Sequence, residues 1–190
     1  MTLLRGNAAA KQRAAEILNR VRKVENPIVV EVGVNRGILS QLLLTSRPDL
    51  TLYMIDSWLG EQEQPDHYKN TKDRNAHRPQ SAADAAKGRV YQMAQRFGPR
   101  AIIIEDNSVD AAKKFEEASV DLVFIDADHS YEGVKGDIEA YLPITKEWIG
   151  GHDYLSKQPE FDFSGVDKAV EEAFDDVETG GNLTWFKRVG

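Results

Sequence analysis

Residues 28–37 read Ile28-Val29-Val30-Glu31-Val32-Gly33-Val34-Asn35-Arg36-Gly37, an apolar run that ends at two glycines. The run is short, β-branched and apolar at consecutive positions, which is typical of a strand buried on both faces of a parallel sheet. The two glycines flank a turn, and apolar residues at helical spacing follow it over residues 38–43. This strand–turn–helix unit predicts the first element of an open α/β sheet.

Later segments repeat this alternation of apolar runs and helical patterns along the chain. The predicted strands occupy residues 28–32, 50–55, 101–104, 120–125 and 148–149, and a turn at Gly180-Gly181 leads into residues 183–186. Alternating strands and helices predict right-handed crossovers. We therefore expect an α/β fold: a doubly wound, mostly parallel Rossmann-like sheet with helices on both faces and an antiparallel C-terminal strand.

The size and apolar content of the chain predict one domain over residues 1–190. Its 190 residues are 41% hydrophobic, which is enough to build one core. Apolar residues recur at helical spacing from Ala10 to Val21, so we expect an N-terminal helix within residues 1–25. Residues 60–80 are nearly free of aliphatic side chains and predict a loop or lid insertion, either functional or disordered.

Charge and composition exclude several classes of partner. The 24 basic and 31 acidic residues give a net charge of −7, which opposes binding to nucleic acid. No apolar run reaches the length of about 18 residues that a membrane span needs. Cysteine is absent, so disulfides and thiolate metal sites are excluded. We expect a cytoplasmic protein that binds neither nucleic acid nor membrane.

Acidic residues stand at or just after the ends of five predicted strands. They are Glu31, Asp56, Asp106, Asp126 and Asp153. Ligands of open α/β sheets bind at the carboxyl ends of the strands. These carboxylates are therefore expected to gather on the rim of the sheet where a ligand binds.

The first two acids indicate what that ligand is. Glu31 stands two residues before Gly33, where a carboxylate would repel a pyrophosphate and attract the amino group of a cationic amino acid. Asp56 follows the second strand, where an acid can accept hydrogen bonds from both ribose hydroxyls. Only two of the three glycines of the dinucleotide fingerprint are present, at Gly33 and Gly37.

In these features the sequence resembles the class I S-adenosylmethionine-dependent methyltransferases, whose first motif is an acid followed by glycines spaced as in residues 31–37. Residues 124–133, 151–154 and 165–170 are similar to a bacterial subgroup of small O-methyltransferase-like proteins related to the macrocin and catechol types. The sequence departs from the family at Asn35, where glycine is more frequent, and at Asp106-Asn107-Ser108, where glycine-aspartate-serine is more frequent.

The resemblance implies a role for each part of the rim. Glu31 and the turn through Gly33, Asn35 and Gly37 would hold the methionine part of S-adenosylmethionine, and Asp56 would hold its ribose. The cofactor-binding residues implied or expected are Glu31, Gly33, Asn35, Gly37, Asp56, Trp58, Asn107, Ser108 and Asp126, with Asn107 and Ser108 at the adenine edge and Trp58 against the ring. The expected partner is a small hydroxylated acceptor.

Catechol-type relatives bind one Mg²⁺ through two aspartates and an amide, and Asp126 and Asp153 match the aspartates. Tyr154 stands at the amide position, while Asp128, His129 and His152 offer other ligands for Mg²⁺ or another divalent cation. Asp126 or His129 would take the proton of the acceptor hydroxyl.

Other functions remain open at this point. A nicotinamide-dependent oxidoreductase would share the architecture, but Glu31 and the missing third glycine disfavour it. A non-catalytic binding protein could retain the fold, and a metal hydrolase could use the aspartates and histidines after the fourth and fifth strands. Oligomeric state is open as well, with a homodimer among the alternatives.

Overall fold

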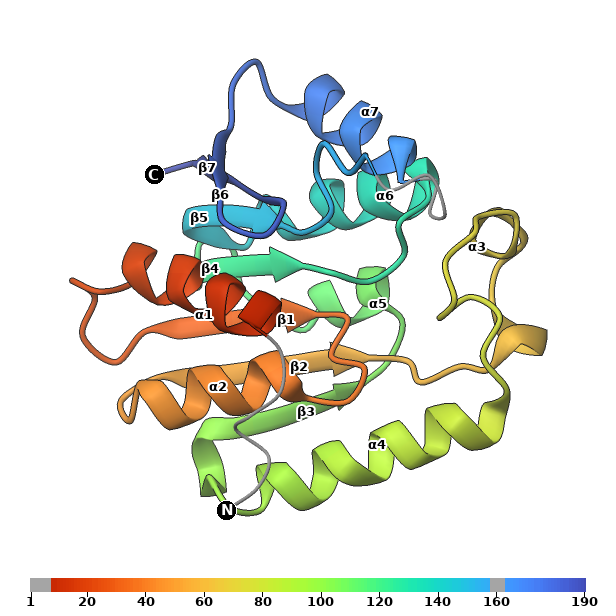
Figure 1. The fold of residues 1–190 in the computed structure, drawn as a ribbon. Coiled ribbons are helices and arrows are strands. Elements are labelled where there is room, and N and C mark those ends of the chain that lie inside the picture. The colour runs from red at the N-terminus through yellow and green to blue at the C-terminus, as the bar shows by residue number, and fades with distance from the viewer. Residues whose placement is uncertain (1–7, 158–162) are drawn as a thin grey trace.

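A computed structural model describes residues 8–157 and 163–190 of the chain, and these residues form a seven-stranded sheet in the order β3-β2-β1-β4-β5-β7-β6 (Figure 1). The parallel strands are β1 (Ile28–Val32), β2 (Thr51–Asp56), β3 (Ala101–Glu105), β4 (Val120–Ile125) and β5 (Thr145–Gly151). The strands β6 (Glu178–Gly180) and β7 (Thr184–Arg188) form a hairpin, and β7 pairs antiparallel with β5. The α/β fold predicted from the sequence is confirmed, including its antiparallel C-terminal end.

Helices cover both faces of the sheet (Figure 1). One face is covered by α1 (Ala8–Arg20), α2 (Ile38–Ser46) and α4 (Gln80–Ala94), and the other by α5 (Ser108–Ala112), α6 (Tyr131–Tyr141) and α7 (Ser164–Ala173). Successive side chains of β1 serve the two layers in turn, because Val29 packs into the first core while Val30 and Val32 pack into the second. Burying each such side chain contributes about 1.5–3 kcal/mol to folding.

The described residues contain a helix in the region where the sequence predicted the N-terminal helix. Within the described residues α1 ends at Arg20, and its buried side chains Ala10, Ala14 and Ile17 are those of the predicted stripe. The chain then turns before Pro27, a position that disfavours helix at the residue preceding it. The part of the expected helix in residues 1–7 lies outside the described residues.

Residues 60–80, which we call the lid segment, lie beside the carboxyl ends of the first four strands (Figure 1). The segment contains a 3₁₀ turn, η2 (Glu61–Glu63), and one short helix, α3 (Asp66–Lys69). Although the segment has few aliphatic residues, the side chains of Tyr68, Asp73 and Ala76 are buried. Polar contacts to the rest of the domain hold the segment in place.

A second 3₁₀ turn, η3 (Gly98–Arg100), leads into β3.

None of the helices in the described parts of the chain has the length and apolar content that a membrane span requires.

Gly33 is expected to be indispensable for folding, whereas Gly88 is not. An alanine Cβ at residue 33 would overlap the backbone carbonyl of Asp126, and the φ of Gly33 is +90°. Gly33→Ala should lower the free energy of unfolding by about 3 kcal/mol or more. Gly88 is exposed within α4 with open space around it, so Gly88→Ala should raise that free energy by about 0.5–1 kcal/mol. Urea denaturation of both variants measures the contrast, and equal effects would contradict it.

Candidate functional site

Backbone hydrogen bonds carry the strand ladders past the ends of the strands and bring the rim loops together. The amide of Gly33 donates to Ile55 O at 2.8 Å, and the amide of Asp126 donates to Val32 O at 2.8 Å. The amide of His152 donates to Ile125 O at 3.1 Å in the same manner. The loops after β1, β4 and β5 therefore start side by side, and their polar side chains meet.

The loops after β1, β2, β3 and β4, together with the lid segment, line a cavity of about 550 Å³. Glu31, Asp56, Asp106 and Asp126 line it, so four of the five acids predicted to share the rim do so. The fifth, Asp153, is buried, and its Oδ2 lies 3.2 Å from Nε2 of His129. The cavity has the size of a small-molecule site, for which about 300–1,000 Å³ is typical.

The glycine turn after β1 forms one wall of the cavity. Gly33, Asn35 and Gly37 all have positive φ, at +90°, +50° and +71°. Asparagine is among the few non-glycine residues that tolerate this region, so Asn35 suits the position where glycine is more frequent in the family. The Asn35 amide donates to Asp56 Oδ2 at 2.7 Å, which joins this turn to the end of β2.

Asp56 is held at the cavity wall by both of its oxygens. Oδ2 accepts from the Asn35 amide, and Oδ1 accepts from the Trp58 amide at 2.7 Å. The guanidinium of Arg78, from the lid segment, lies 3.7 Å from Oδ1. The carboxylate is thus oriented by backbone N–H groups and has remaining lone pairs for a ligand.

The structure corrects the expectation that Trp58 contacts the cofactor. Its side chain is 1% exposed, packs in the core beneath α1, α2 and α4, and is not among the residues that line the cavity. The indole N–H donates to Asn35 O at 2.9 Å, so its polar atom is satisfied within the protein. Trp58 supports the glycine turn from behind instead of facing a ligand.

The predicted adenine edge, Asn107 and Ser108, lines the cavity at the start of α5. The side chain of Asn107 caps that helix by accepting from the Asp110 amide at 2.9 Å, so it is occupied within the protein. Beside Ser108, burial raises the pKa of Asp137 to about 7, and Asp137 Oδ2 has no hydrogen-bond partner in the described part of the chain. Asp137 was not predicted from the sequence, because a single acid on a helix carries no signal of its burial.

Glu31 is a buried acid at the floor of the cavity. Its Oε2 accepts from the Ser40 hydroxyl at 2.6 Å. Burial raises the pKa of Glu31 to about 8, against the opposing effect of the Ser40 hydrogen bond. In this arrangement the carboxyl group is largely protonated at neutral pH, and a cation beside it would favour its ionised form.

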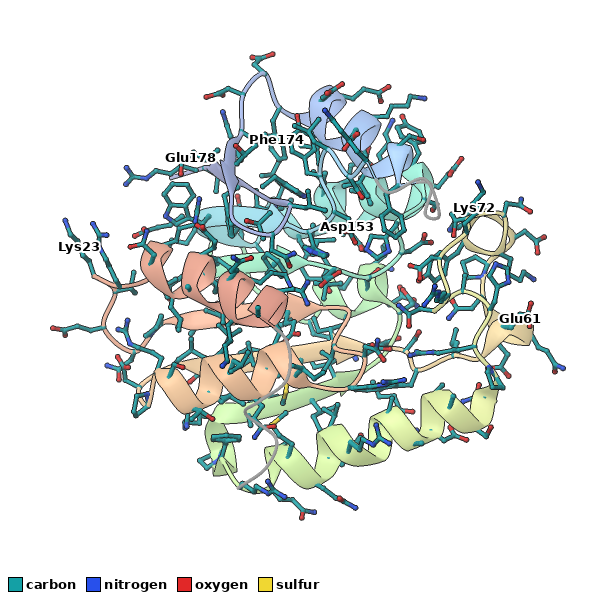
Figure 2. All side chains as sticks on the ribbon, in the orientation of Figure 1. Lys23, Glu61, Lys72, Asp153, Phe174 and Glu178 are labelled. Carbon is teal, nitrogen blue, oxygen red and sulfur yellow. The ribbon has the colours of Figure 1, made fainter. Side chains whose placement is uncertain are left out.

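Four side chains from the loops after β4 and β5 form a compact group that we call the Asp/His cluster: Asp126, His129, His152 and Asp153. Four of their oxygen and nitrogen atoms lie within 4.8 Å of one another. Figure 2 shows Asp153 in the interior of the molecule, whereas Lys72 and Glu61 of the lid segment project from its edge. Asp126 and His129 also line the cavity, so the cluster forms its end wall.

The charges of the cluster depend on one another. Burial opposes ionisation throughout, but the two histidines lower the pKa of Asp126 well below its usual value. Burial likewise opposes the charge of His129, while hydrogen bonds with the surrounding carboxylates raise its pKa well above the usual value. Burial alone would lower the pKa of His152, but the nearby charge of Asp126 raises it to about 9. Within the cluster the carboxylates therefore favour the charged form of the imidazoles, and the imidazoles favour the charged form of the carboxylates.

The lid segment contributes Asp73 to this site. Asp73 Oδ2 accepts from His129 Nδ1 at 2.6 Å and from the Tyr68 hydroxyl at 2.8 Å. The sequence analysis missed Asp73, since the polar segment around it offers no pattern that singles out one acid. The contact joins the lid segment directly to the Asp/His cluster.

The N-terminal helix contributes Arg13, which the sequence analysis also missed. Its Nη1 lies 3.0 Å from His152 Nε2 and donates to Asn182 Oδ1 at 3.0 Å. Its Nε lies 3.8 Å from Asp126 Oδ2. Arg13 therefore supplies a positive charge to the cluster from an element far away in the sequence.

Comparison with known proteins agrees with the geometry. Residues 30–154 match the profile of a family described as a methyltransferase domain. Comparison with curated proteins gives no match.

Solved structures with the same fold share little sequence with the chain. A putative O-methyltransferase from Klebsiella pneumoniae is 15% identical with a TM-score of 0.62, over 97% of this chain and 81% of that one. A putative caffeoyl-CoA O-methyltransferase from Staphylococcus aureus is 15% identical with a TM-score of 0.59, over 98% and 94%. Spermidine synthase from Thermotoga maritima is 15% identical with a TM-score of 0.56, over 94% of this chain, which spans 60% of the synthase.

The buried Glu31 is expected to make stability depend on pH. Its folded pKa, about 8, lies above the unfolded value of 4.5, so the folded protein keeps a proton that the unfolded chain releases. Its contribution to stability is complete below pH 4.5 and is lost as pH rises through 8. Glu31→Gln should therefore gain stability relative to the native chain by up to about 1.4 kcal/mol per pH unit between pH 5 and 8.

Urea denaturation at pH 5, 6.5 and 8 without ligand measures this difference, with Glu117→Gln, at an exposed position, as the control. A stability difference between Glu31→Gln and the native chain that stays constant over this range would contradict the expectation.

Proposed function

The chain belongs to the methyltransferase domain family, and we propose that it transfers a methyl group from S-adenosylmethionine to a hydroxyl group of a small acceptor. The family and the class I Rossmann-like fold make it an S-adenosylmethionine-dependent methyltransferase. The small hydroxylated acceptor is the part that we propose. Transfer from cofactor to acceptor within one site is supported by a single cavity that runs from the glycine turn and Asp56 to Asp126 and His129.

The residues of the cavity fit a cationic amino-acid nucleoside. Within residues 8–157 and 163–190, no cation makes a hydrogen bond to the buried Glu31, so an ammonium group would supply the positive charge that stabilises its ionised form. Asp56 has lone pairs for the ribose hydroxyls, and Asn107 and Ser108 lie where the adenine would bind. Near Glu31, the backbone at Gly33 lies so close to the backbone carbonyl of Asp126 that a Cβ atom at residue 33 would overlap it.

Residues at the other end of the cavity act on the acceptor. When bound, S-adenosylmethionine supplies an activated methyl group on a positively charged sulfur. After transfer of the methyl group, that sulfur is the neutral thioether of S-adenosylhomocysteine. Asp126 lines the cavity and is placed to receive the proton that the acceptor hydroxyl loses, and His129 beside it can do so in its neutral form. Residues of the lid segment, among them His67 and Tyr68, line this end of the cavity, where they would help to exclude water and to position the acceptor.

A divalent cation at Asp126 and Asp153 is the second part of the proposal. The geometry of the cluster supports it, because Asp126 Oδ1 and Asp153 Oδ2 lie 3.4 and 3.2 Å from the same buried nitrogen, His129 Nε2, so both carboxylates face one point. A cation there would lower the pKa of an acceptor hydroxyl. Tyr154, at the position of the family's amide, packs against the apolar core, and so offers no replacement for that ligand.

Calorimetry with S-adenosylhomocysteine tests the cofactor site. We expect the full chain to bind it, and Asp56→Asn to weaken binding by about 1–3 kcal/mol through loss of charge-assisted hydrogen bonds. Asp175→Asn, at an exposed position away from the cavity, is the matched control and should bind as the native chain does. Binding of a nicotinamide dinucleotide in place of the nucleoside would instead support the oxidoreductase alternative.

Transfer of a labelled methyl group to a panel of small hydroxylated compounds tests the reaction. We expect Asp126→Asn to lower the rate by about 10²–10⁴-fold, the usual contribution of a positioned proton acceptor. Its affinity for S-adenosylhomocysteine should change far less than its rate. Cofactor binding without transfer to any hydroxylated compound would favour a non-catalytic binding protein.

A further inference from the structure

Asp137 is a buried acid of α6 for which the proposed reaction has no use. Its side chain is 1% exposed, and the residue is among those that line the cavity. Its Oδ2 has no hydrogen-bond partner among the described residues. A buried acceptor without a partner is unfavourable, so an unpaired oxygen at the wall of a ligand cavity indicates a ligand that supplies the missing donor.

The other oxygen of Asp137 is held by α5, the neighbouring helix. The Ser108 side chain makes a hydrogen bond with the Asp137 carboxyl group, and because Oδ2 has no partner this bond engages Oδ1. One turn further along α6, the Tyr141 hydroxyl donates to Ser108 O at 2.8 Å. The carboxyl group is therefore fixed in orientation, and Oδ2 is the oxygen that remains for a ligand.

The wall around Asp137 has room for a flat ring. A Cβ built at Gly136 would have one described atom within 4 Å outside its own helix and chain neighbours, Val109 Cγ2 at 3.8 Å. The side chains of Val109 and Ile38 are exposed and line the same cavity. Exposed aliphatic side chains in a ligand cavity offer apolar contact to the faces of a base. The space between α5 and α6 thus combines apolar surface with one unpaired acceptor.

Asn107, to which the resemblance assigns the adenine edge, has its polar atoms engaged elsewhere. Its Oδ1 accepts from the Asp110 amide at 2.9 Å, and its Nδ2 donates to Asp110 Oδ2 at 2.5 Å. Asp106 is engaged as well, since Oδ1 accepts from the Asn107 amide at 2.9 Å and Oδ2 accepts from Lys114 at 2.8 Å. Of these three side chains at the cavity wall, Asp137 is the one with an unpaired oxygen among the described residues.

We propose that Asp137 Oδ2 accepts a hydrogen bond from the exocyclic amino group of the adenine, and that this contact makes the site select a 6-amino purine over a 6-oxo purine. The inference deepens the proposed function and rests on it for the identity of the ligand. Adenine presents an amino donor at this edge, whereas a 6-oxo purine presents a carbonyl acceptor. A carbonyl facing the buried carboxylate would leave both acceptors without a donor, which is costly.

Calorimetry with S-adenosylhomocysteine and its 6-oxo analogue, S-inosylhomocysteine, tests the preference on the native full chain. The two ligands share the amino acid, the sulfur and the ribose, so the ratio of their affinities isolates the contact to the base. Titration at pH 8 keeps Asp137 largely ionised, because burial raises its pKa to about 7. We expect the adenine compound to bind about 10–100-fold more tightly, and equal affinities would overturn the proposal.

Asp137→Asn tests whether this residue is the selecting group. With the amide oxygen bound to Ser108, the NH₂ group takes the place of Oδ2, so the site presents a donor where it presented an acceptor. We expect affinity for S-adenosylhomocysteine to fall and affinity for the 6-oxo analogue to rise, so that the preference is lost. A merely structural role would weaken both ligands alike, and a preference that stays as in the native chain would refute the proposal.

Glu139→Gln is the matched control for this substitution, since Glu139 is exposed on the same helix and lies outside the cavity. It should bind both ligands as the native chain does.

Gly136→Ala tests where the base lies. The added methyl group would contact Val109 at an ordinary distance, so the variant should fold and melt as the native chain does. The methyl group would occupy space between α5 and α6, and we expect both nucleosides to bind more weakly. Unchanged affinity for both would contradict the placement of the base beside Asp137.

The same ligands keep this inference separate from the proposed function. A chain that prefers the adenine compound through Asp137 but transfers no methyl group to hydroxylated compounds would retain the inference and lose the proposed function. Methyl transfer without a preference between the two bases would refute the role of Asp137 alone. Failure of the native chain to bind either nucleoside would overturn both.

Discussion

The site depends on backbone hydrogen bonds that continue the parallel ladders beyond β1, β4 and β5. Through them the first residues of three loops start in register, which places Glu31, Asp126 and His152 at one end of the sheet. Such close approach requires glycine at two crossings, since a Cβ at Gly33 would overlap Asp126 O and one at Gly151 would crowd Ile125 O. The chemistry of the rim therefore follows from packing of the backbone, before any side chain is considered.

Burial of charge is the second constraint on the site. Carboxylates and imidazoles removed from water are costly unless they are paired, and the protein supplies partners from elements far apart in the sequence. Arg13 reaches the cluster from α1, and Asp73 reaches it from the lid segment. Glu31 and Asp137 are exceptions, because burial raises the pKa of both, and both border the cavity. Buried acids without a cation are where a ligand with donor groups would be stabilised most.

The sequence predicted the part of the site that local pattern determines. Gly33, Asp56 and Asp126 follow apolar strands, and an open parallel sheet necessarily brings such positions to one rim. Arg13 and Asp73 were not predictable, because their roles arise from tertiary contacts over long stretches of chain. Trp58 was misassigned because its place after β2 does not reveal that the indole turns into the core. Outside the site, α1 and the strand β5 were predicted with inexact ends, as Lys146 and Glu147 interrupt the apolar pattern of β5.

We expect the nucleoside of the cofactor to bind between the glycine turn and the end of β2. A crystal structure of the chain with S-adenosylhomocysteine would show this position. We expect the amino group to lie within hydrogen-bond distance of Glu31 and the ribose hydroxyls to contact Asp56, with the sulfur facing Asp126. Density for the nucleoside on another surface, or with its ribose away from Asp56, would contradict it.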